Sequence, residues 1–106
     1  MLDKTEHMND LLDWYQNLLT EKQLLCMSLY YFEDLSLAEI ADEVNTSRSA
    51  VFDLLKRTAN ILIEYENKLH LVENYKKRSK IYSELSALNN QEVNRLVGEL
   101  EKIDTE

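Results

Sequence analysis

The sequence contains no proline and only one glycine among its 106 residues. These two residue types punctuate strands and turns, so their near absence argues against a β-rich fold. The composition, 44% hydrophobic and 30% charged, favours residues such as Leu, Glu and Lys, which lose little rotamer freedom in helices. We therefore expect an all-α protein. A chain of this length suits one domain, residues 1–106, around a single core.

Cysteine is also scarce, since Cys26 is the only one and no disulfide can form within the chain. Its apolar neighbours at positions 24, 25 and 27 would not activate a thiol, so we expect a buried side chain rather than a catalytic one. His7 and His70 lack metal-ligand spacing, and the glycine-poor chain has no phosphate-binding loop. We predict that the protein is not an enzyme and holds no metal or cofactor.

A long apolar run is missing as well. No stretch approaches the roughly 18 residues needed to cross a bilayer. The first ten residues, MLDKTEHMND, are polar and acidic, unlike a signal peptide. We expect a cytoplasmic protein that does not insert into membranes.

Apolar residues recur at steps of three and four along the chain, which is typical of amphipathic helices. A first helix should end near Thr20, and one side of it should carry Met8, Leu11, Leu12, Tyr15, Leu18 and Leu19. Thr20 and Gln23 form a capping-box pattern, in which each side chain satisfies a backbone donor. A second helix should therefore start there and run to about Phe32, where Glu33-Asp34 marks a break.

Ser36 and Glu39 repeat the capping-box pattern and predict a third, short helix through about Glu43. Asn45 tolerates the left-handed backbone conformation that a tight turn requires. A Ser/Thr cap at position 46 or 47 then predicts a helix that begins at residue 48 or 49 and runs toward His70. Two further helices are expected, around residues 75–88 and 93–103, separated by ALNNQEV.

The segment LSLAEIADEVNTSRSAVFDLLKRT, residues 35–58, has the pattern of a helix-turn-helix motif. Ala41 is small where the first helix must approach the second, Asn45 suits the turn, and Val51 is a β-branched residue at the crossing. We predict a helix-turn-helix core at about residues 18–72 and a helical tail at 73–106. The alternative is a pair of packed helices that only looks like this motif.

The outward face of the second motif helix is the predicted DNA-binding surface. Its basic groups can contact phosphates or guanine edges, and an aromatic ring there can touch a thymine methyl group. Asp53 can accept a hydrogen bond from cytosine but also repels phosphates. The alternative is a solvated helix face of mixed charge. The candidate residues are Arg48, Ser49, Phe52, Asp53, Lys56 and Arg57.

The formal net charge of −8 opposes nucleic-acid binding, but the charge is uneven. Acidic residues prevail before position 36 and after position 80, whereas residues 61–80 carry five basic and three acidic side chains. A second basic group, YKKRSK, has aromatic neighbours and is a candidate contact to RNA phosphates. The alternative is an ordinary solvated surface. The candidate residues are Lys76, Lys77, Arg78 and Lys80.

The run LLTEKQLLCMSLYYFEDLSLAEIADEVNTSRSAVFDLLKRT, residues 18–58, resembles the promoter-reading region of bacterial sigma factors, region 4. With LLDWYQNLLTEKQ before it and YENKLHL after it, the chain resembles more closely the YlxM family of small bacterial proteins, over about residues 8–72. The resemblance implies a small all-helical helix-turn-helix protein. Together with the apolar periodicity, it gives the expected fold: a sigma region 4-like helix-turn-helix without a wing, with a long recognition helix and a C-terminal helical extension. The resemblance also implies a regulatory role linked to the signal recognition particle pathway.

Two functional hypotheses follow. The first is a DNA-binding regulator. It is expected to be a homodimer, because the apolar stripes at residues 51–72 and 93–103 offer more surface than a small monomer covers. The second is a protein or RNA adaptor whose acidic faces meet a basic partner, such as signal recognition particle proteins or RNA. In that case the helix-turn-helix motif is an inherited scaffold.

Overall fold

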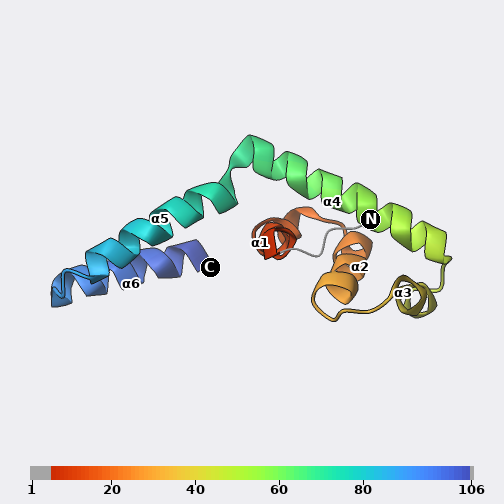
Figure 1. The fold of residues 1–106 in the computed structure, drawn as a ribbon, viewed down its shortest axis with the longest axis horizontal. Helices are drawn as coiled ribbons and strands as arrows, with labels where there is room; N and C mark the ends of the chain where they lie inside the picture. Colours follow the sequence, from red (N-terminus) through yellow and green to blue (C-terminus); the bar gives the residue numbers. More distant parts are fainter. Residues whose placement is uncertain (1–5, 106) are drawn as a thin grey trace. The chain divides into compact units, whose positions relative to one another are not determined.

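The computed structural model describes residues 6–105, and these residues are almost entirely helical, without a strand among them (Figure 1). The all-α prediction is therefore confirmed. In chain order the elements are α1 (Glu6–Tyr15), the 3-10 helix η1 (Gln16–Leu18), α2 (Glu21–Tyr31), α3 (Leu37–Glu43), α4 (Arg48–Leu69), α5 (Leu71–Ser86) and α6 (Gln91–Thr105).

The chain divides into two compact units, Met1–His70 and Leu71–Glu106. His70 ends α4 as a C-cap in the left-handed conformation, with φ of 56°. The boundary lies two residues before the one predicted between positions 72 and 73. That the whole chain folds as a single domain stays a prediction.

The first unit packs α1, α2 and α3 against α4, and all three lie on the same side of this long helix (Figure 1). The hydroxyl of Tyr15 in α1 donates a hydrogen bond of 2.5 Å to the carboxylate of Glu66, near the end of α4. The unit thus extends beyond the motif expected at residues 18–72. The buried side chains include Met8, Leu11, Leu12, Tyr15, Cys26, Met27, Leu29, Ile40, Ala41, Val51, Leu55, Thr58, Ala59 and Leu62.

The first helix differs from the expectation at its end. The α-helix stops at Tyr15 and tightens into the 3-10 helix η1. Because a 3-10 helix has fewer residues per turn, positions after Tyr15 no longer follow the stripe of α1. Leu18, which the periodicity grouped with the apolar side, is consequently 54% exposed.

The helix starts predicted from the two capping boxes are confirmed. Thr20 and Gln23 form a reciprocal capping box, and Ser36 and Glu39 form another. In the second box the Glu39 carboxylate accepts from the backbone N–H of Ser36 at 2.9 Å, and this hydrogen bond lowers the pKa of Glu39. The break at Asp34 also appears, with φ of 56°.

Cys26 is 1% exposed, and burial raises the pKa of its thiol. A thiol with a raised pKa is mostly protonated at neutral pH and is a poor nucleophile. The predicted role of Cys26 as a small buried side chain is confirmed.

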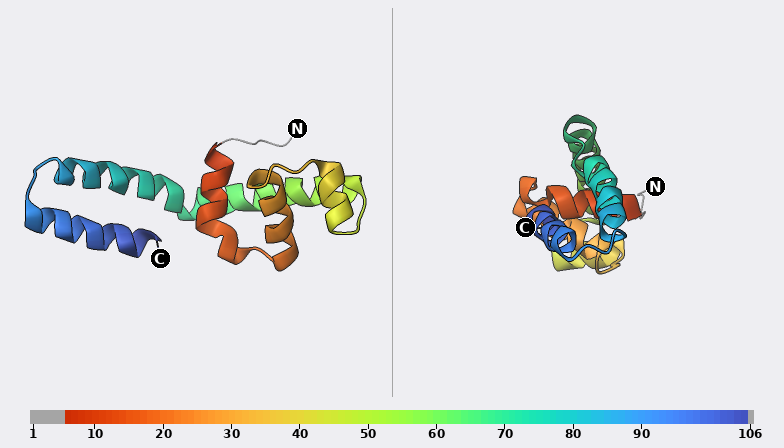
Figure 2. Two further views of the ribbon diagram at one scale, coloured as in Figure 1. Left: turned by 90° about the horizontal axis from the view of Figure 1, so that it is seen from below. Right: turned by 90° about the vertical axis from the view of Figure 1, so that its left-hand side faces the viewer.

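The second unit is an antiparallel hairpin of α5 and α6 (Figure 2). Asn89 adopts φ of 54° in the connection, and the side chain of Asn90 caps α6 by accepting from the Val93 N–H at 3.1 Å. The Asp104 carboxylate lies 3.1 Å from the Arg78 guanidinium and accepts from the Tyr82 hydroxyl at 2.8 Å, which raises the pKa of Tyr82. These contacts fix the register of the two helices.

Candidate nucleic-acid interface

The turn between α3 and α4 has a defined hydrogen-bonded geometry. Asn45 follows the end of α3 in the left-handed conformation, with φ of 56°, and the Thr46 N–H donates to the Ala41 carbonyl at 3.0 Å. This arrangement is a Schellman motif, in which a left-handed residue lets the backbone satisfy the last carbonyls of a helix. Ser47 then caps α4 by accepting from the Ala50 N–H at 3.1 Å. The predicted hinge is confirmed.

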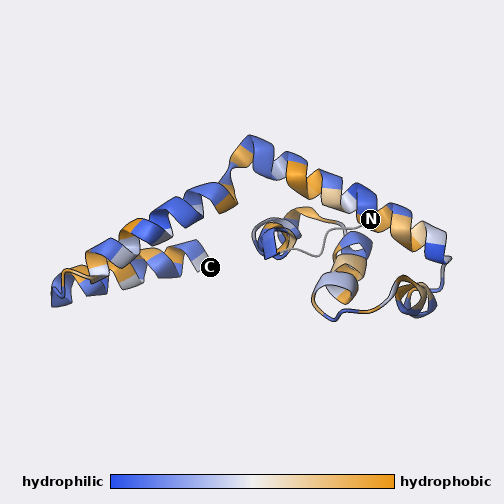
Figure 3. Ribbon diagram, viewed as in Figure 1, coloured by the Kyte–Doolittle hydropathy of each residue, from blue (hydrophilic) through white to orange (hydrophobic). Residues whose placement is uncertain are grey.

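The contact between α3 and α4 is close and apolar. Ala41 is 6% exposed, and Ile40 on α3 and Val51 and Leu55 on α4 are almost fully buried. Figure 3 shows hydrophobic and hydrophilic residues alternating along α4, as expected of an amphipathic helix. The buried stripe therefore fixes which face of α4 is directed to solvent.

The structure brings the six predicted DNA-binding residues together on the first three turns of α4. Phe52 is half-buried, and the other five are exposed. Over residues 6–105, Arg48 and Lys56 form no ion pair, and the Arg57 side chain makes a long hydrogen bond of 3.4 Å to the Asp53 carbonyl. Arg48 and Lys56 can thus meet an external anion without breaking a bond within the protein. Their DNA contacts stay a prediction.

One residue of this surface was missed by the sequence interpretation. Leu37, at the start of α3, lines a shallow depression together with Arg48, Ser49, Phe52 and Asp53. Leu37 belongs to the apolar stripe of α3, and this place in the sequence pattern gives no sign of the depression beside it. The depression combines an apolar wall with a cation and a hydroxyl, which suits contact with a base edge.

The α3 helix adds negative charge beside this surface. Glu39, Asp42 and Glu43 are exposed, whereas α3 carries no basic residue. In helix-turn-helix complexes the first helix crosses the DNA backbone, so these carboxylates oppose close phosphate approach. By contrast, the first turn of α4 has no acidic residue, and its positive dipole end attracts anions. Of the two motif helices, α4 is therefore the one that offers a favourable position for a phosphate.

The second basic group lies on α5, but its members do not form one surface. The Arg78 side chain is turned toward α6 and paired with Asp104, and its guanidinium lies 5.9 Å from the Tyr75 ring centre. Lys77 pairs with Glu73 at 3.4 Å, while Lys76 and Lys80 are exposed. The structure thus gives Arg78 a role within the hairpin. An RNA contact by Lys76, Lys77, Arg78 and Lys80 stays a prediction.

Among the residues that the structure describes, no group of three or more His, Cys, Asp or Glu side chains could hold a metal ion. No described helix is both long enough and apolar enough to cross a membrane.

Comparison with known proteins agrees with the helix-turn-helix geometry. A family model described as "UPF0122: Putative helix-turn-helix protein, YlxM / p13 like" matches residues 2–102. The chain belongs to the UPF0122 family. A UPF0122 protein of Halalkalibacterium halodurans is 52% identical over 107 residues, covering 99% of this chain and 98% of that protein. A UPF0122 protein of Bacillus thuringiensis is 47% identical over 110 residues, covering 98% and 100%. The UPF0122 match confirms the resemblance inferred from the sequence.

Proposed function

We propose that this UPF0122 protein is a DNA-binding regulator that contacts duplex DNA with the first three turns of α4. The observation that carries this proposal is the position of Arg48 and Lys56. They are exposed on one face of a helix that a Schellman turn and the buried Ala41 hold against α3. This is the support that a recognition helix requires to present side chains to the major groove.

Local charge reconciles this role with an acidic chain. At physiological salt the Debye length is about 8 Å, so exposed acidic groups farther away are largely screened. Arg48, Lys56 and Arg57 remain effective at short range, whereas Asp53 reduces the attraction. The expected binding is modest in affinity and sensitive to salt, because only a few phosphates are neutralised.

The regulator is proposed to act in the cytoplasm as a homodimer. Two copies of a helix-turn-helix motif related by a two-fold axis can contact two half-sites on DNA, which raises both affinity and selectivity. The link to the signal recognition particle pathway is part of the proposal, and it rests on the YlxM resemblance of residues 8–72.

The competing function is an adaptor that binds basic proteins or RNA of the signal recognition particle. The observation that favours it is the acidic surface of α3, where Glu39, Asp42 and Glu43 are exposed next to α4. Positive partners would approach this surface more readily than DNA.

Selection of bound fragments from the native genome, with transcripts included, tests the two functions together. The DNA-binding role predicts enrichment of a few duplex sequences, and Arg48→Ala should abolish this enrichment. Lys68→Ala is the matched control. Lys68 is exposed on the same helix, lies beyond the first three turns of α4, and pairs with Glu64. Enrichment of transcripts alone, unchanged by Arg48→Ala, would favour the adaptor.

A further inference from the structure

The hairpin of α5 and α6 repeats a three-residue pattern at its inner seam. The triplets are Ile81-Tyr82-Ser83, Leu96-Val97-Gly98 and Ile103-Asp104-Thr105. The middle residue of each is directed toward the other helix, since Tyr82 and Val97 are buried and Asp104 bonds to α5. In each triplet a large apolar residue comes before the inward position, and a small residue comes after it.

Helix geometry places the first residues of the three triplets on one face of the hairpin. Each residue advances by about 100° around its helix, so the residue before an inward position lies to one side of the seam. Two antiparallel helices are related by a two-fold axis perpendicular to the plane that contains both helix axes. This rotation exchanges the helices but keeps every residue on the same face of the hairpin. Ile81, Leu96 and Ile103 therefore share one face, while Ser83, Gly98 and Thr105 share the opposite face.

The shared face is apolar and open to solvent. Ile81, Leu96 and Ile103 are 54%, 46% and 70% exposed. Leu85 and Leu100 follow inward residues by three positions, which places them between the seam and this same face. We call these five residues, Ile81, Leu85, Leu96, Leu100 and Ile103, the apolar hairpin face.

The hairpin buries little by itself. Of its described residues, Val72, Tyr82 and Val97 are the buried ones. Isolated helices of about 15 residues are marginal in water and gain most of their stability from packing an amphipathic face. The apolar hairpin face is the part of α5 and α6 that further packing would cover.

The net charges of α5 and α6 indicate what covers the apolar hairpin face. The α5 helix carries four basic and two acidic residues, for a net charge of +2, and α6 carries two basic and four acidic residues, for a net charge of −2. Two hairpins that meet with α5 against α5 would bring like charges together. Pairing α5 of one hairpin with α6 of another brings opposite charges together.

We infer that two copies of this chain associate through the apolar hairpin face, with α5 of each copy packed against α6 of the other in a four-helix bundle. This inference specifies the surface of the homodimer proposed above and depends on that proposal. The two-fold axis runs parallel to the helices, because only this axis brings α5 of one copy onto α6 of its partner.

The contacts within one hairpin set the register of the bundle. Asp104 bonds to both Arg78 and Tyr82, so Ile103 is level with Ile81, and Leu100 is level with Leu85 about one turn farther along. Rotation about an axis parallel to the helices does not move a residue along them, so the same residues are level in the partner copy. Ile81 of one copy therefore faces Ile103 of the other copy.

Sedimentation equilibrium of the full chain tests the surface with a matched pair of variants. Ile81→Glu places a charge in the proposed contact, and association should weaken by at least about 100-fold. Ser83→Glu adds the same charge two residues later on the opposite face and should leave the dissociation constant within about threefold. Circular dichroism monitors helix content in both variants. If the Ile81→Glu variant loses helix content, Ile103→Glu replaces it in the test. The Ile103 side chain is 70% exposed, so a charge there should not disturb the fold of one hairpin.

Two results would overturn the inference in distinguishable ways. A wild-type chain that stays monomeric at about 100 μM would reject the homodimer together with its surface. A dimer that tolerates Glu at positions 81 and 103 would reject this surface and leave the homodimer standing.

A second measurement checks the register. In a Cys26→Ser background, chains with Ile81→Cys and chains with Ile103→Cys are mixed and oxidised. A mixed 81–103 disulfide between the two chains is expected, whereas linkage of 81 only to 81 would show α5 packed on α5 and would contradict the inferred arrangement.

Discussion

The Tyr15 hydroxyl donates a 2.5 Å hydrogen bond to the Glu66 carboxylate and thereby joins α1 to the distal part of α4 across 51 positions of the sequence. The Tyr15 side chain is fully buried, and its ring lies 5.9 Å from that of Tyr65, measured between centres. The α4 helix is thus held at both ends, by α3 near its start and by α1 near its end. This support explains how one helix of 22 residues can present its first turns in a fixed position.

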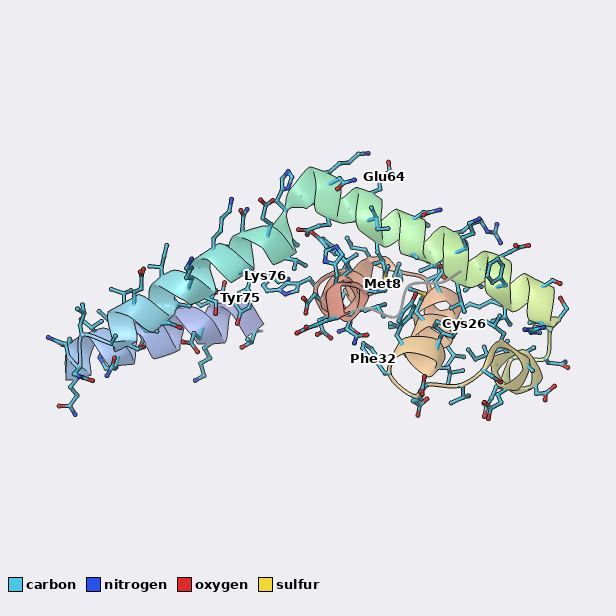
Figure 4. The ribbon with its side chains drawn as sticks, in the orientation of Figure 1. Met8, Cys26, Phe32, Glu64, Tyr75 and Lys76 are labelled. Carbon is cyan, nitrogen blue, oxygen red and sulfur yellow. The ribbon has the colours of Figure 1, made fainter. Side chains whose placement is uncertain are left out.

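Removal of the Tyr15 hydroxyl should destabilise the first unit. Hydrogen bonds to charged groups contribute about 1.5–3 kcal/mol, so Tyr15→Phe should lower the free energy of unfolding by about 2 kcal/mol. Urea denaturation measures the change. Glu64→Gln is the control, because Glu64 projects from the side of α4 opposite α1 and α2 (Figure 4) and should cost less than about 0.5 kcal/mol. Equal effects of the two substitutions would contradict a structural role for the Tyr15 contact.

The close approach of α3 to α4 predicts a large difference between two alanines of α3. Ala41 is buried and Ala38 is exposed. Ala41→Glu should destabilise the protein by several kcal/mol, in the range of about 3–5 kcal/mol for an unpaired buried charge, and lower its melting temperature. Ala38→Glu should change stability little. A melting temperature that Ala41→Glu leaves unchanged would reject the helix-turn-helix packing.

The two capping boxes should differ in their response to pH. The hydrogen bond from Ser36 lowers the pKa of Glu39 below its ordinary value of 4.5. A carboxyl group with a lowered folded-state pKa stabilises the fold above that ordinary value, and this contribution is lost as the pH falls through the lowered pKa. Gln23 fills the same position in the other box but does not titrate.

Stability measured across the acid range compares the two caps. Glu39→Ala should destabilise the protein at neutral pH, and the difference from wild type should shrink as the pH falls below 4.5. Gln23→Ala should give a difference that is nearly constant with pH. A constant difference for Glu39→Ala would show that its carboxylate does not form the cap in solution.

Gly98 offers a stabilising substitution. It lies within α6, and a Cβ atom at this position would have no neighbouring atom within 4 Å in the described structure. Glycine inside a helix costs about 0.5–1 kcal/mol relative to alanine, so Gly98→Ala should raise the free energy of unfolding by up to about 1 kcal/mol. A loss of stability would mean that another surface packs closely against Gly98 in solution.

Much of the fold was predictable because its signals are local. The capping boxes at Thr20 and Ser36 depend on residues three positions apart, and the turn at Asn45 depends on one residue that tolerates positive φ. The face of α4 followed from periodicity, because the buried stripe fixes the opposite side. These features require no knowledge of distant contacts.

The remaining features depend on pairs that are far apart in the sequence. Tyr15 and Glu66, 51 positions apart, each looked like an ordinary member of an amphipathic helix. Arg78 was grouped with three neighbouring lysines, because nothing nearby indicates its partner Asp104, 26 positions away. Tertiary packing selected these partners, and no local pattern encodes them.

The salt dependence of duplex DNA binding tests the central claim most directly. If α4 contacts phosphates through Arg48, Lys56 and Arg57, the logarithm of the affinity should fall with the logarithm of salt with a slope of about −3 per protomer. The Lys56→Ala, Arg57→Ala double variant should reduce this slope by about 2, whereas Asp53→Asn should strengthen binding by removing a repulsion. No duplex binding at low salt, or a slope that these α4 variants leave unchanged, would contradict the account.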